Sequence, residues 1–208
     1  METRLAIVES PMKVFLEILN EGEAPFIVND FNKQALRKIF NYFVYPNSQL
    51  DKRRGIMLIG NCGTGKTRLM RHFNTLCARF NGFPKFRFET VKQLQNKVIA
   101  AERRDYMAFY EDYFSQNAID LLVDDIGTET KQLNYFGNVS LWFEDFICER
   151  YNLFENHGIR THVTTNLNPK ELQEFYSARV YDRMKAMFNV VMMSGESWRG
   201  KKAHVLRL

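Results

Sequence analysis

Residues 60–67 read GNCGTGKT and directly follow the apolar run IMLI at residues 56–59. The stretch fits the phosphate-loop pattern G-x-x-x-x-G-K-[ST], in which a buried strand leads through a glycine-rich turn into a helix. Backbone N–H groups can surround a polyphosphate only where no Cβ stands in the way, and glycine provides that clearance. The sequence therefore predicts a nucleoside triphosphate site.

The loop residues have separate expected roles. Lys66 is predicted to reach the β- and γ-phosphate oxygens, and the Thr67 hydroxyl to bind Mg²⁺, while the helix that begins here directs its positive dipole end at the phosphates. The predicted nucleotide contacts are the loop and the residue after it: Gly60, Asn61, Cys62, Gly63, Thr64, Gly65, Lys66, Thr67 and Arg68.

The composition is that of an ordinary soluble protein, with 208 residues, 45% hydrophobic and 25% charged. We expect one principal domain and a cytoplasmic location, because no apolar run approaches the roughly 18 residues needed to cross a bilayer and the N-terminus lacks a signal-peptide core. The three cysteines have no metal-like or paired spacing. A net charge of +5 fits a polyanionic partner and equally fits a plain soluble protein.

Strand-like and helix-like segments alternate from residue 55 onward. This alternation predicts a three-layer α/β fold around a mainly parallel five-stranded sheet. Residues 1–50 are expected to form a short helical extension, and residues 51–208 the nucleotide-binding domain with a minimal or absent lid. The predicted strands are residues 56–59, 85–88, 121–123, 161–165 and 190–193.

Two acids follow the apolar strand LLV at residues 121–123. Parallel strands deliver their carboxyl ends to the edge where the phosphate loop lies, so these acids are expected at the nucleotide. We assign Asp124 to Mg²⁺ and Asp125 to orienting the attacking water. Because Asp125 is one methylene shorter than a glutamate, it is expected to hold water less well or to share the task with Glu129, and turnover is expected to be slow.

Asn166 ends the strand-like stretch at residues 161–165 and is expected near the γ-phosphate. An alternative is that it forms a turn or caps a helix, as Asn168-Pro169 just beyond it suggests. Farther along, Arg179 and Arg183 lie four residues apart on one helical face. Such a face usually pairs with acids or water, but an arginine can also reach a neighbouring subunit's γ-phosphate.

Five motifs follow one another along the chain: GNCGTGKT, LLVDDIG, TTNLNPKEL, RVYDRM and GESWR. Through these motifs the chain resembles the helicase-loader and transposase-helper branch of the AAA+ ATPases, the DnaC and IstB type. The resemblance covers roughly residues 50 to 200. It implies an ATP- and Mg²⁺-dependent ATPase that self-associates into a ring or spiral. It makes Asn166 the first sensor, Arg183 with Arg179 the inter-subunit arginine finger, and Arg199 the second sensor.

The resemblance also implies that the protein binds DNA, a replicative helicase or a transposase. Within the chain, cations and aromatics intermix between residues 85 and 114, a pattern that suits single-stranded DNA. The alternative is that the aromatics form core and the charges a solvated surface. The residues concerned are Lys85, Arg87, Arg103, Arg104, Tyr106, Phe109, Tyr110, Tyr113 and Phe114.

Other function classes remain open from the sequence. Asp125 in place of glutamate also fits an ATP-switched binding module that rarely hydrolyses its nucleotide. The chain size and phosphate loop fit a small-molecule kinase, which the acid pair and the distal arginines disfavour. A GTPase is less consistent still, because no Asn-Lys-x-Asp motif follows the loop, so adenine is the expected base.

Overall fold

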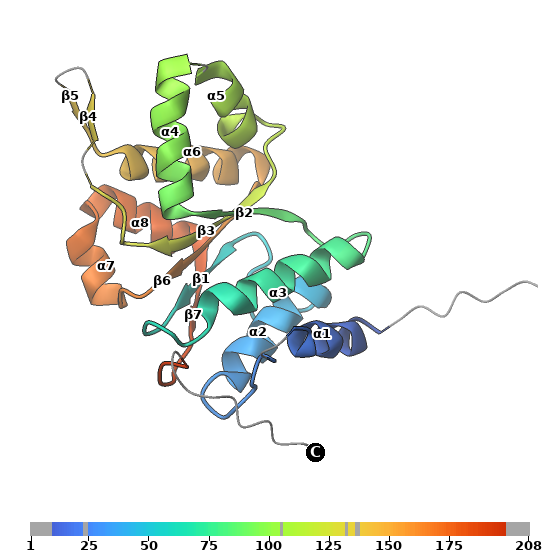
Figure 1. Ribbon diagram of the computed structural model, residues 1–208. Coiled ribbons are helices and arrows are strands. Elements are labelled where there is room, and N and C mark those ends of the chain that lie inside the picture. Colours follow the sequence, from blue (N-terminus) through green and yellow to red (C-terminus); the bar gives the residue numbers. More distant parts are fainter. Residues whose placement is uncertain (1–9, 23–24, 105, 132, 136–137, 199–208) are drawn as a thin grey trace, which may run out of the picture.

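The computed structural model contains a central sheet of five parallel strands. It describes residues 10–22, 25–104, 106–131, 133–135 and 138–198. In chain order the strands of this sheet are β1 (Gly55–Ile59), β2 (Phe86–Thr90), β3 (Asp120–Ile126), β6 (Thr161–Thr165) and β7 (Phe188–Met192). Their spatial order is β2-β3-β6-β1-β7 (Figure 1), which places the strand before the phosphate loop between β6 and β7.

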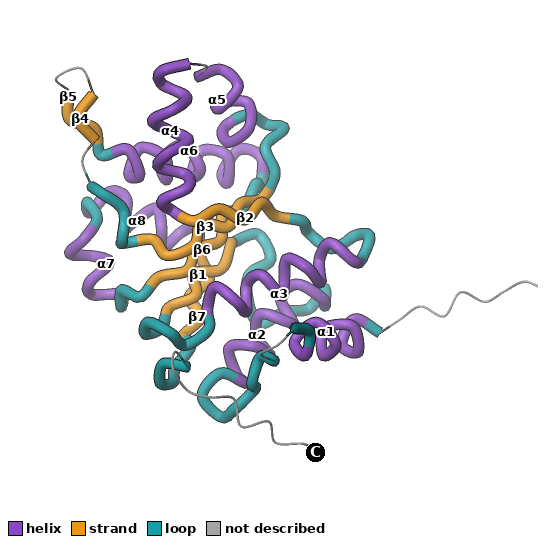
Figure 2. The backbone as a smooth tube through the Cα atoms, in the orientation of Figure 1, coloured by secondary structure: helices purple, strands orange, loops and turns teal. Residues whose placement is uncertain are grey.

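Helices cover both faces of the sheet (Figure 2), as the three-layer prediction requires. On one face lie α1 (Pro11–Asn20), α2 (Lys33–Val44) and α3 (Lys66–Arg79). On the other lie α4 (Val91–Arg104), α5 (Tyr106–Phe114), α6 (Trp142–His157), α7 (Pro169–Phe175) and α8 (Ala178–Met187). Every residue of β1 is buried, because its side chains enter the two cores alternately.

The two N-terminal helices pack directly on the helix that follows the phosphate loop. The Phe15 ring of α1 stacks on Phe73 of α3 with centroids 4.5 Å apart, and Phe43 of α2 lies 5.4 Å from the same ring. Both helices therefore share one core with the sheet. The division of the chain at residue 50 stays a prediction.

The five predicted strands are confirmed: the strand at residues 161–165 agrees at both ends, and the other four differ by up to three residues at an end. A two-stranded hairpin, β4 (Leu133–Tyr135) and β5 (Asn138–Ser140), was not predicted; it projects beside α6 in Figure 1. The described residues after β7, 193–198, form no helix. Within the described part of the chain, no helix combines the length and apolarity needed to cross a membrane.

The amino ends of β3 and β6 are fixed by a fully buried arginine. The Arg150 guanidinium of α6 donates to the Thr161 hydroxyl at 2.9 Å, to the carbonyls of Tyr113 and Arg160 at 2.9 Å each, and to the carbonyl of Ile119 at 3.3 Å. Burial lowers the pKa of Arg150 to about 10. Because the amino ends of these strands are held rigidly, their carboxyl ends, where the predicted site residues lie, are also held in place.

Candidate nucleotide-binding site

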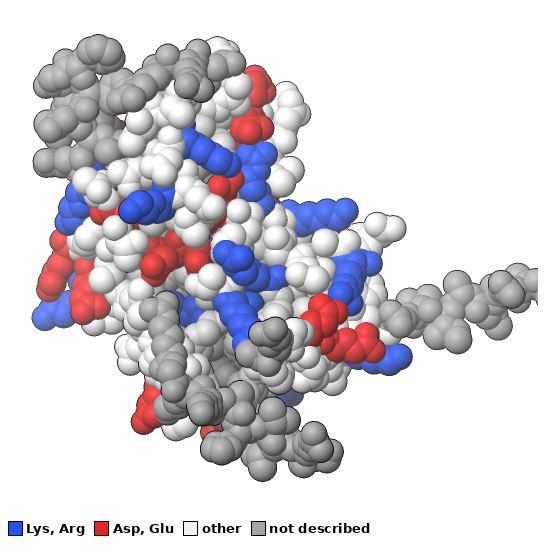
Figure 3. Space-filling model, viewed as in Figure 1, with Lys and Arg blue, Asp and Glu red and all other residues white. Residues whose placement is uncertain are grey.

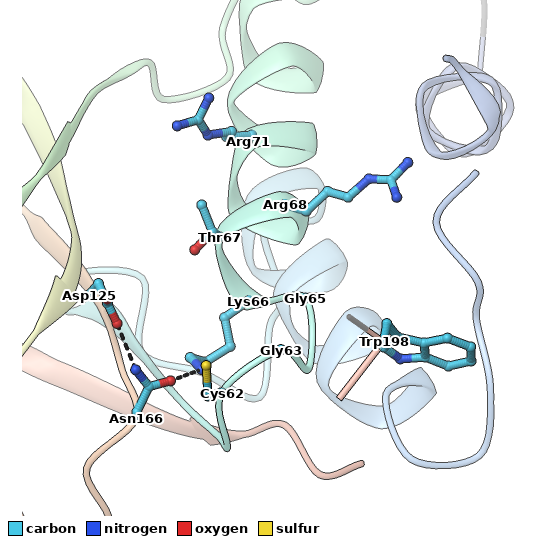
Figure 4. A pocket seen from close by; sticks show the side chains of 10 residues that line it. All are labelled: Cys62, Gly63, Gly65, Lys66, Thr67, Arg68, Arg71, Asp125, Asn166 and Trp198. Carbon is cyan, nitrogen blue, oxygen red and sulfur yellow. Dashed lines mark hydrogen bonds between the residues drawn. The ribbon is translucent and has the colours of Figure 1, made fainter. Parts of the chain in front are cut away.

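Six of the nine predicted nucleotide-contact residues line one cavity of about 510 Å³ at the carboxyl edge of the sheet, and Gly60, Asn61 and Thr64 do not. This volume is within the range typical of small-molecule sites. Figure 4 shows its side chains arranged around the start of α3. The cavity is lined by Cys62, Gly63, Gly65, Lys66, Thr67, Arg68, Arg71, Asp125, Asn166 and Trp198.

The phosphate loop requires glycine for two reasons: the backbone conformation at some positions and the close approach of neighbouring residues at others. Gly63 and Gly65 have φ angles of 81° and 97°, a region that costs other residues free energy. A Cβ on Gly60 would stand 2.2 Å from the Met193 carbonyl oxygen, and one on Gly63 would stand 2.1 Å from Ser197 Oγ. The glycines therefore allow the segment after β7 to pack closely against the loop, and they also leave room for phosphate.

Lys66, Asn166 and Asp125 form a continuous hydrogen-bonded chain across the cavity. Lys66 Nζ donates to Asn166 Oδ1 at 2.7 Å, and Asn166 Nδ2 donates to Asp125 Oδ1 at 2.8 Å. The ammonium group also donates to the carbonyls of Gly60 and Asn61, at 2.7 and 3.0 Å. A cation from α3, an amide from the residue after β6 and a carboxylate from β3 thus lie together, although they are distant in sequence.

The alternative role of Asn166 as a helix cap belongs to its neighbour. Asn168 is the N-cap of α7: its side chain accepts from the backbone N–H groups of Lys170 and Glu171, and the Glu171 carboxylate completes a capping box. The Asn166 side chain takes no part in this cap and bonds to Lys66 and Asp125.

A second cluster joins Thr67 to Asp124. Asp124 Oδ1 accepts from the Thr67 hydroxyl at 3.0 Å and from the Thr164 hydroxyl at 2.6 Å. Burial raises the pKa of Asp124, while the two hydroxyl donors limit that rise because they favour the carboxylate. Thr164 also accepts from the Asp125 N–H at 2.9 Å, so one buried hydroxyl positions both acids. Sequence reasoning missed Thr164; its signal is the second-last position of the strand that precedes Asn166.

A bulge in β3 changes the directions of the Asp124 and Asp125 side chains at the carboxyl edge of the sheet. The β3–β6 register runs regularly to Val123 opposite Val163 and resumes with Ile126 opposite Thr165, so β3 carries one extra residue there. Successive residues of a regular strand point to opposite faces, whereas a bulge redirects them. Asp125 has a φ of 66°, the only positive value at a non-glycine position among the described residues.

The Thr67 and Asp124 oxygens suit Mg²⁺. This ion prefers hard oxygen ligands and is usually held by one or two carboxylates together with substrate phosphates and water. No group of three or more His, Cys, Asp or Glu side chains suitable for a metal occurs among the described residues, so a metal cage built from protein side chains alone is not present there. When bound, Mg²⁺ would supply positive charge at the phosphate oxygens.

The fold of this chain is similar to solved structures of replication proteins. No protein-family model and no curated protein sequence matches the chain significantly. Domain III of the replication initiation protein DnaA from Thermotoga maritima is 16% identical, with a TM-score of 0.61 over 81% of this chain and 64% of that one. The DnaC helicase loader is 21% identical, with a TM-score of 0.60 over 87% of this chain and 99% of that one.

A third structure is the replication initiator DnaA bound to AMPPCP and single-stranded DNA, 15% identical, with a TM-score of 0.58 over 82% of this chain and 49% of that one. The chain has the fold of AAA+ ATPases. It spans less than two thirds of both DnaA structures and nearly the whole of the DnaC structure.

Within this AAA+ fold the arginines of α8 lie apart from the cavity. Arg183 and Arg179 are not among its lining residues. The Arg183 guanidinium carbon lies 5.1 Å from the centre of the Tyr151 ring of α6, and Arg179 is exposed. Arg199 lies outside the described residues. The finger and second-sensor roles of these arginines therefore stay predictions.

The expected part of Glu129 in holding the attacking water is not supported by the geometry, and one residue of the cavity was not predicted. Glu129 does not reach the cavity, because its carboxylate accepts from the Tyr176 hydroxyl at 2.6 Å and the Gly127 N–H at 2.7 Å. Arg71, which sequence reasoning missed, lines the cavity and lies over the Phe88 ring at 4.4 Å. Its position four residues after Thr67 on α3 could have indicated that the two share a helix face.

The aromatic and basic segment divides between core and surface. Phe109, Tyr113 and Phe114 are buried, whereas Tyr106 and Tyr110 are exposed with ring centroids 6.4 Å apart. Of the basic residues, Arg87 pairs with Asp112 at 3.3 Å and Lys85 is exposed; the side chains of Arg103 and Arg104 lie outside the described part. Figure 3 shows basic and acidic side chains intermixed on the face in view. A stacking surface in this segment would thus be small.

Proposed function

We propose that this chain is a cytoplasmic AAA+ ATPase that binds Mg²⁺-ATP, hydrolyses it slowly and acts as a DNA-replication accessory protein. The observation that carries the proposal is the hydrogen-bonded chain from Lys66 through Asn166 to Asp125, beside the Thr67–Asp124 pair. These five side chains come from α3, β3 and the end of β6, and each has a predicted role toward polyphosphate.

Each group has a distinct task in the proposed reaction. The loop N–H groups and the Lys66 ammonium hold the phosphates, and Thr67 with Asp124 holds the metal ion. Asp125 orients the attacking water, and Asn166 keeps Asp125 in place while contacting the γ-phosphate. Because the reaction needs positioning and charge more than covalent chemistry, a rigid hydrogen-bonded set of this kind is well suited to it.

Calorimetric titration of Mg²⁺-ATP into the protein tests nucleotide binding. Lys66→Ala is expected to raise the Kd for ATP by about a hundredfold or more, because it removes a charge-assisted contact to the phosphates. Lys170→Ala is the matched control, since that lysine is exposed on α7 and pairs loosely with Glu174 at 3.9 Å. A wild-type protein that gives no magnesium-dependent heat would contradict the proposal.

DNA and a replicative helicase are the proposed partners, together with further copies of the chain in a ring or spiral. Support comes from the net charge of +5 and from the likeness to a helicase loader and to a DnaA structure that contains single-stranded DNA. Phosphate release, measured with and without single-stranded DNA, should rise when DNA is added. Equal rates at DNA concentrations that saturate binding would remove DNA as a regulator of turnover.

A second candidate is a nucleotide-switched binding module, such as a transposase helper, with little hydrolysis. It is favoured by the short Asp125 side chain, one oxygen of which already accepts from Asn166. This candidate predicts tight Mg²⁺-ATP binding with phosphate release at background, both with and without DNA. The two measurements above therefore distinguish the candidates.

A further inference from the structure

The segment after β7 returns across the phosphate loop. The Met193 N–H donates to the Ile59 carbonyl at 2.7 Å, and the Trp198 N–H donates to the Gly63 carbonyl at 3.0 Å. Ser197 lies so close to Gly63 that a Cβ there would stand 2.1 Å from its Oγ. The segment is thus fixed to the end of β1 and to the loop, and its contact with Gly63 places Trp198 at the cavity.

The cavity has two chemically different ends. Figure 4 shows Asp125 and Asn166 at one end and the Trp198 indole at the other, with Lys66, Gly63 and Gly65 between them. The Arg68 side chain extends toward the same side as Trp198. A nucleoside triphosphate is a linear ligand, so when its γ-phosphate lies at the Asp125 end its base lies toward the opposite end.

The Trp198 end is suited to an aromatic ring. Trp198 is 39% exposed, whereas Trp142, the other tryptophan, is 4% exposed within the core. The described lining residues at this end are Gly63, Gly65, Arg68 and Trp198, of which Trp198 alone presents an aromatic face. Stacking on an indole needs only the π-face that every base has.

We propose that Trp198 binds the base of the nucleotide by stacking on its purine ring. The inference rests on the proposed nucleotide site and adds the residue that holds the nucleoside. It predicts that purine nucleotides bind more tightly than pyrimidine nucleotides, because the larger ring covers more of the indole.

The test compares Mg²⁺-ATP with Mg²⁺-tripolyphosphate, which has the phosphates and no base. Trp198→Ala should raise the Kd for ATP by roughly 5- to 150-fold, which corresponds to the loss of one contact between a base and an aromatic ring. The Kd for tripolyphosphate should stay within about twofold, because phosphate contacts are retained. Trp198→Phe should recover most of the ATP affinity, and Tyr106→Ala, which removes an exposed aromatic on α5, should leave both ligands unaffected.

A second readout leaves Trp198 in place. In Trp142→Phe protein Trp198 is the only indole, so ATP should quench the fluorescence and tripolyphosphate should not. Equal weakening of both ligands in Trp198→Ala would mean that the residue only supports the loop and would overturn the stacking. Unchanged ATP affinity, or no quenching, would overturn it as well. A wild-type protein that binds neither ligand would overturn the proposed function together with this inference.

Discussion

The nucleotide cavity and helix α8 hold residues predicted for the same reaction, yet only the cavity residues touch one another. Lys66, Asn166 and Asp125 are joined by hydrogen bonds of 2.7 and 2.8 Å, whereas Arg183 rests on the Tyr151 ring. The carboxyl ends of parallel strands necessarily meet, so one chain can assemble the first set alone. Helix α8 packs through its apolar face, which leaves its arginines outside the cavity, so the proposed finger role would need a second copy of the chain.

The largest expected effect separates the two regions. Arg183→Ala should lower the turnover number by about a thousandfold, because an arginine supplied to a neighbour's γ-phosphate stabilises the transition-state charge. The Kd for ATP should stay within about twofold, since the cavity of the same chain is intact. Lys185→Ala is the matched control, because it removes an exposed cation of α8 that pairs with Asp182 at 2.9 Å.

Mixing two inactive variants tests whether Arg183 acts between subunits. Lys66→Ala subunits retain Arg183 but bind ATP poorly, and Arg183→Ala subunits bind ATP but lack the finger. Mixed assemblies should therefore regain phosphate release above either variant alone. If the two variants assemble together and the mixture stays inactive, the inter-subunit role of Arg183 is wrong.

The next largest effect is expected at Asn166, which joins Lys66 to Asp125 within the cavity. Asn166→Ala should lower turnover by about a hundredfold, because it frees Lys66 and leaves Asp125 without the donor that orients it. Asn166→Asp should be at least as damaging, since a carboxylate can accept from Lys66 but cannot donate to Asp125. Asn168→Ala, two residues away, should cost about 1 kcal/mol of stability through the lost cap and leave turnover intact. Turnover that tolerates Asn166→Asp would show that the donor is not needed.

The smallest expected effect is a loss of folding stability at low pH, which limits the pH range in which the two regions can be compared. His162 of β6 is fully buried, its Nδ1 accepts from the Ile56 N–H at 3.0 Å, and burial lowers its pKa to about 3. The unfolded chain, with an ordinary histidine pKa near 6.5, therefore binds more protons than the folded chain between these values, so stability falls as the pH drops below about 6.5.

At pH 5 this difference corresponds to a loss of about 2 kcal/mol of unfolding free energy relative to pH 8. Urea unfolding at the two pH values measures it. His162→Asn keeps an acceptor near the Nδ1 position without a titrating ring, so its stability should depend less on pH across this interval. An equally steep dependence in His162→Asn would assign the acid sensitivity to other groups.

The sequence predicted what local patterns and strand direction determine. The glycine-rich loop, the five strands and the convergence of Lys66, Asp125 and Asn166 follow from one motif and from the shared edge of a parallel sheet. The β3 bulge and the role of Thr164 depend on how β3 pairs with β6, which neither strand specifies alone. The aromatic segment was predictable in part, because Tyr106 with Tyr110, and Phe109 with Tyr113, each share a helix face at a spacing of four.

The strand order also determines when the phosphate loop can be completed. Strand β1 pairs with β6 and β7, and Thr161 at the start of β6 lies 102 residues beyond Ile59 at the end of β1. At synthesis rates of about 5–20 residues per second, a nascent chain waits roughly 5 to 20 s for the first of these neighbours. Until then the apolar strand Gly55–Ile59 has neither native partner, and its unpaired backbone groups are open to non-native pairing.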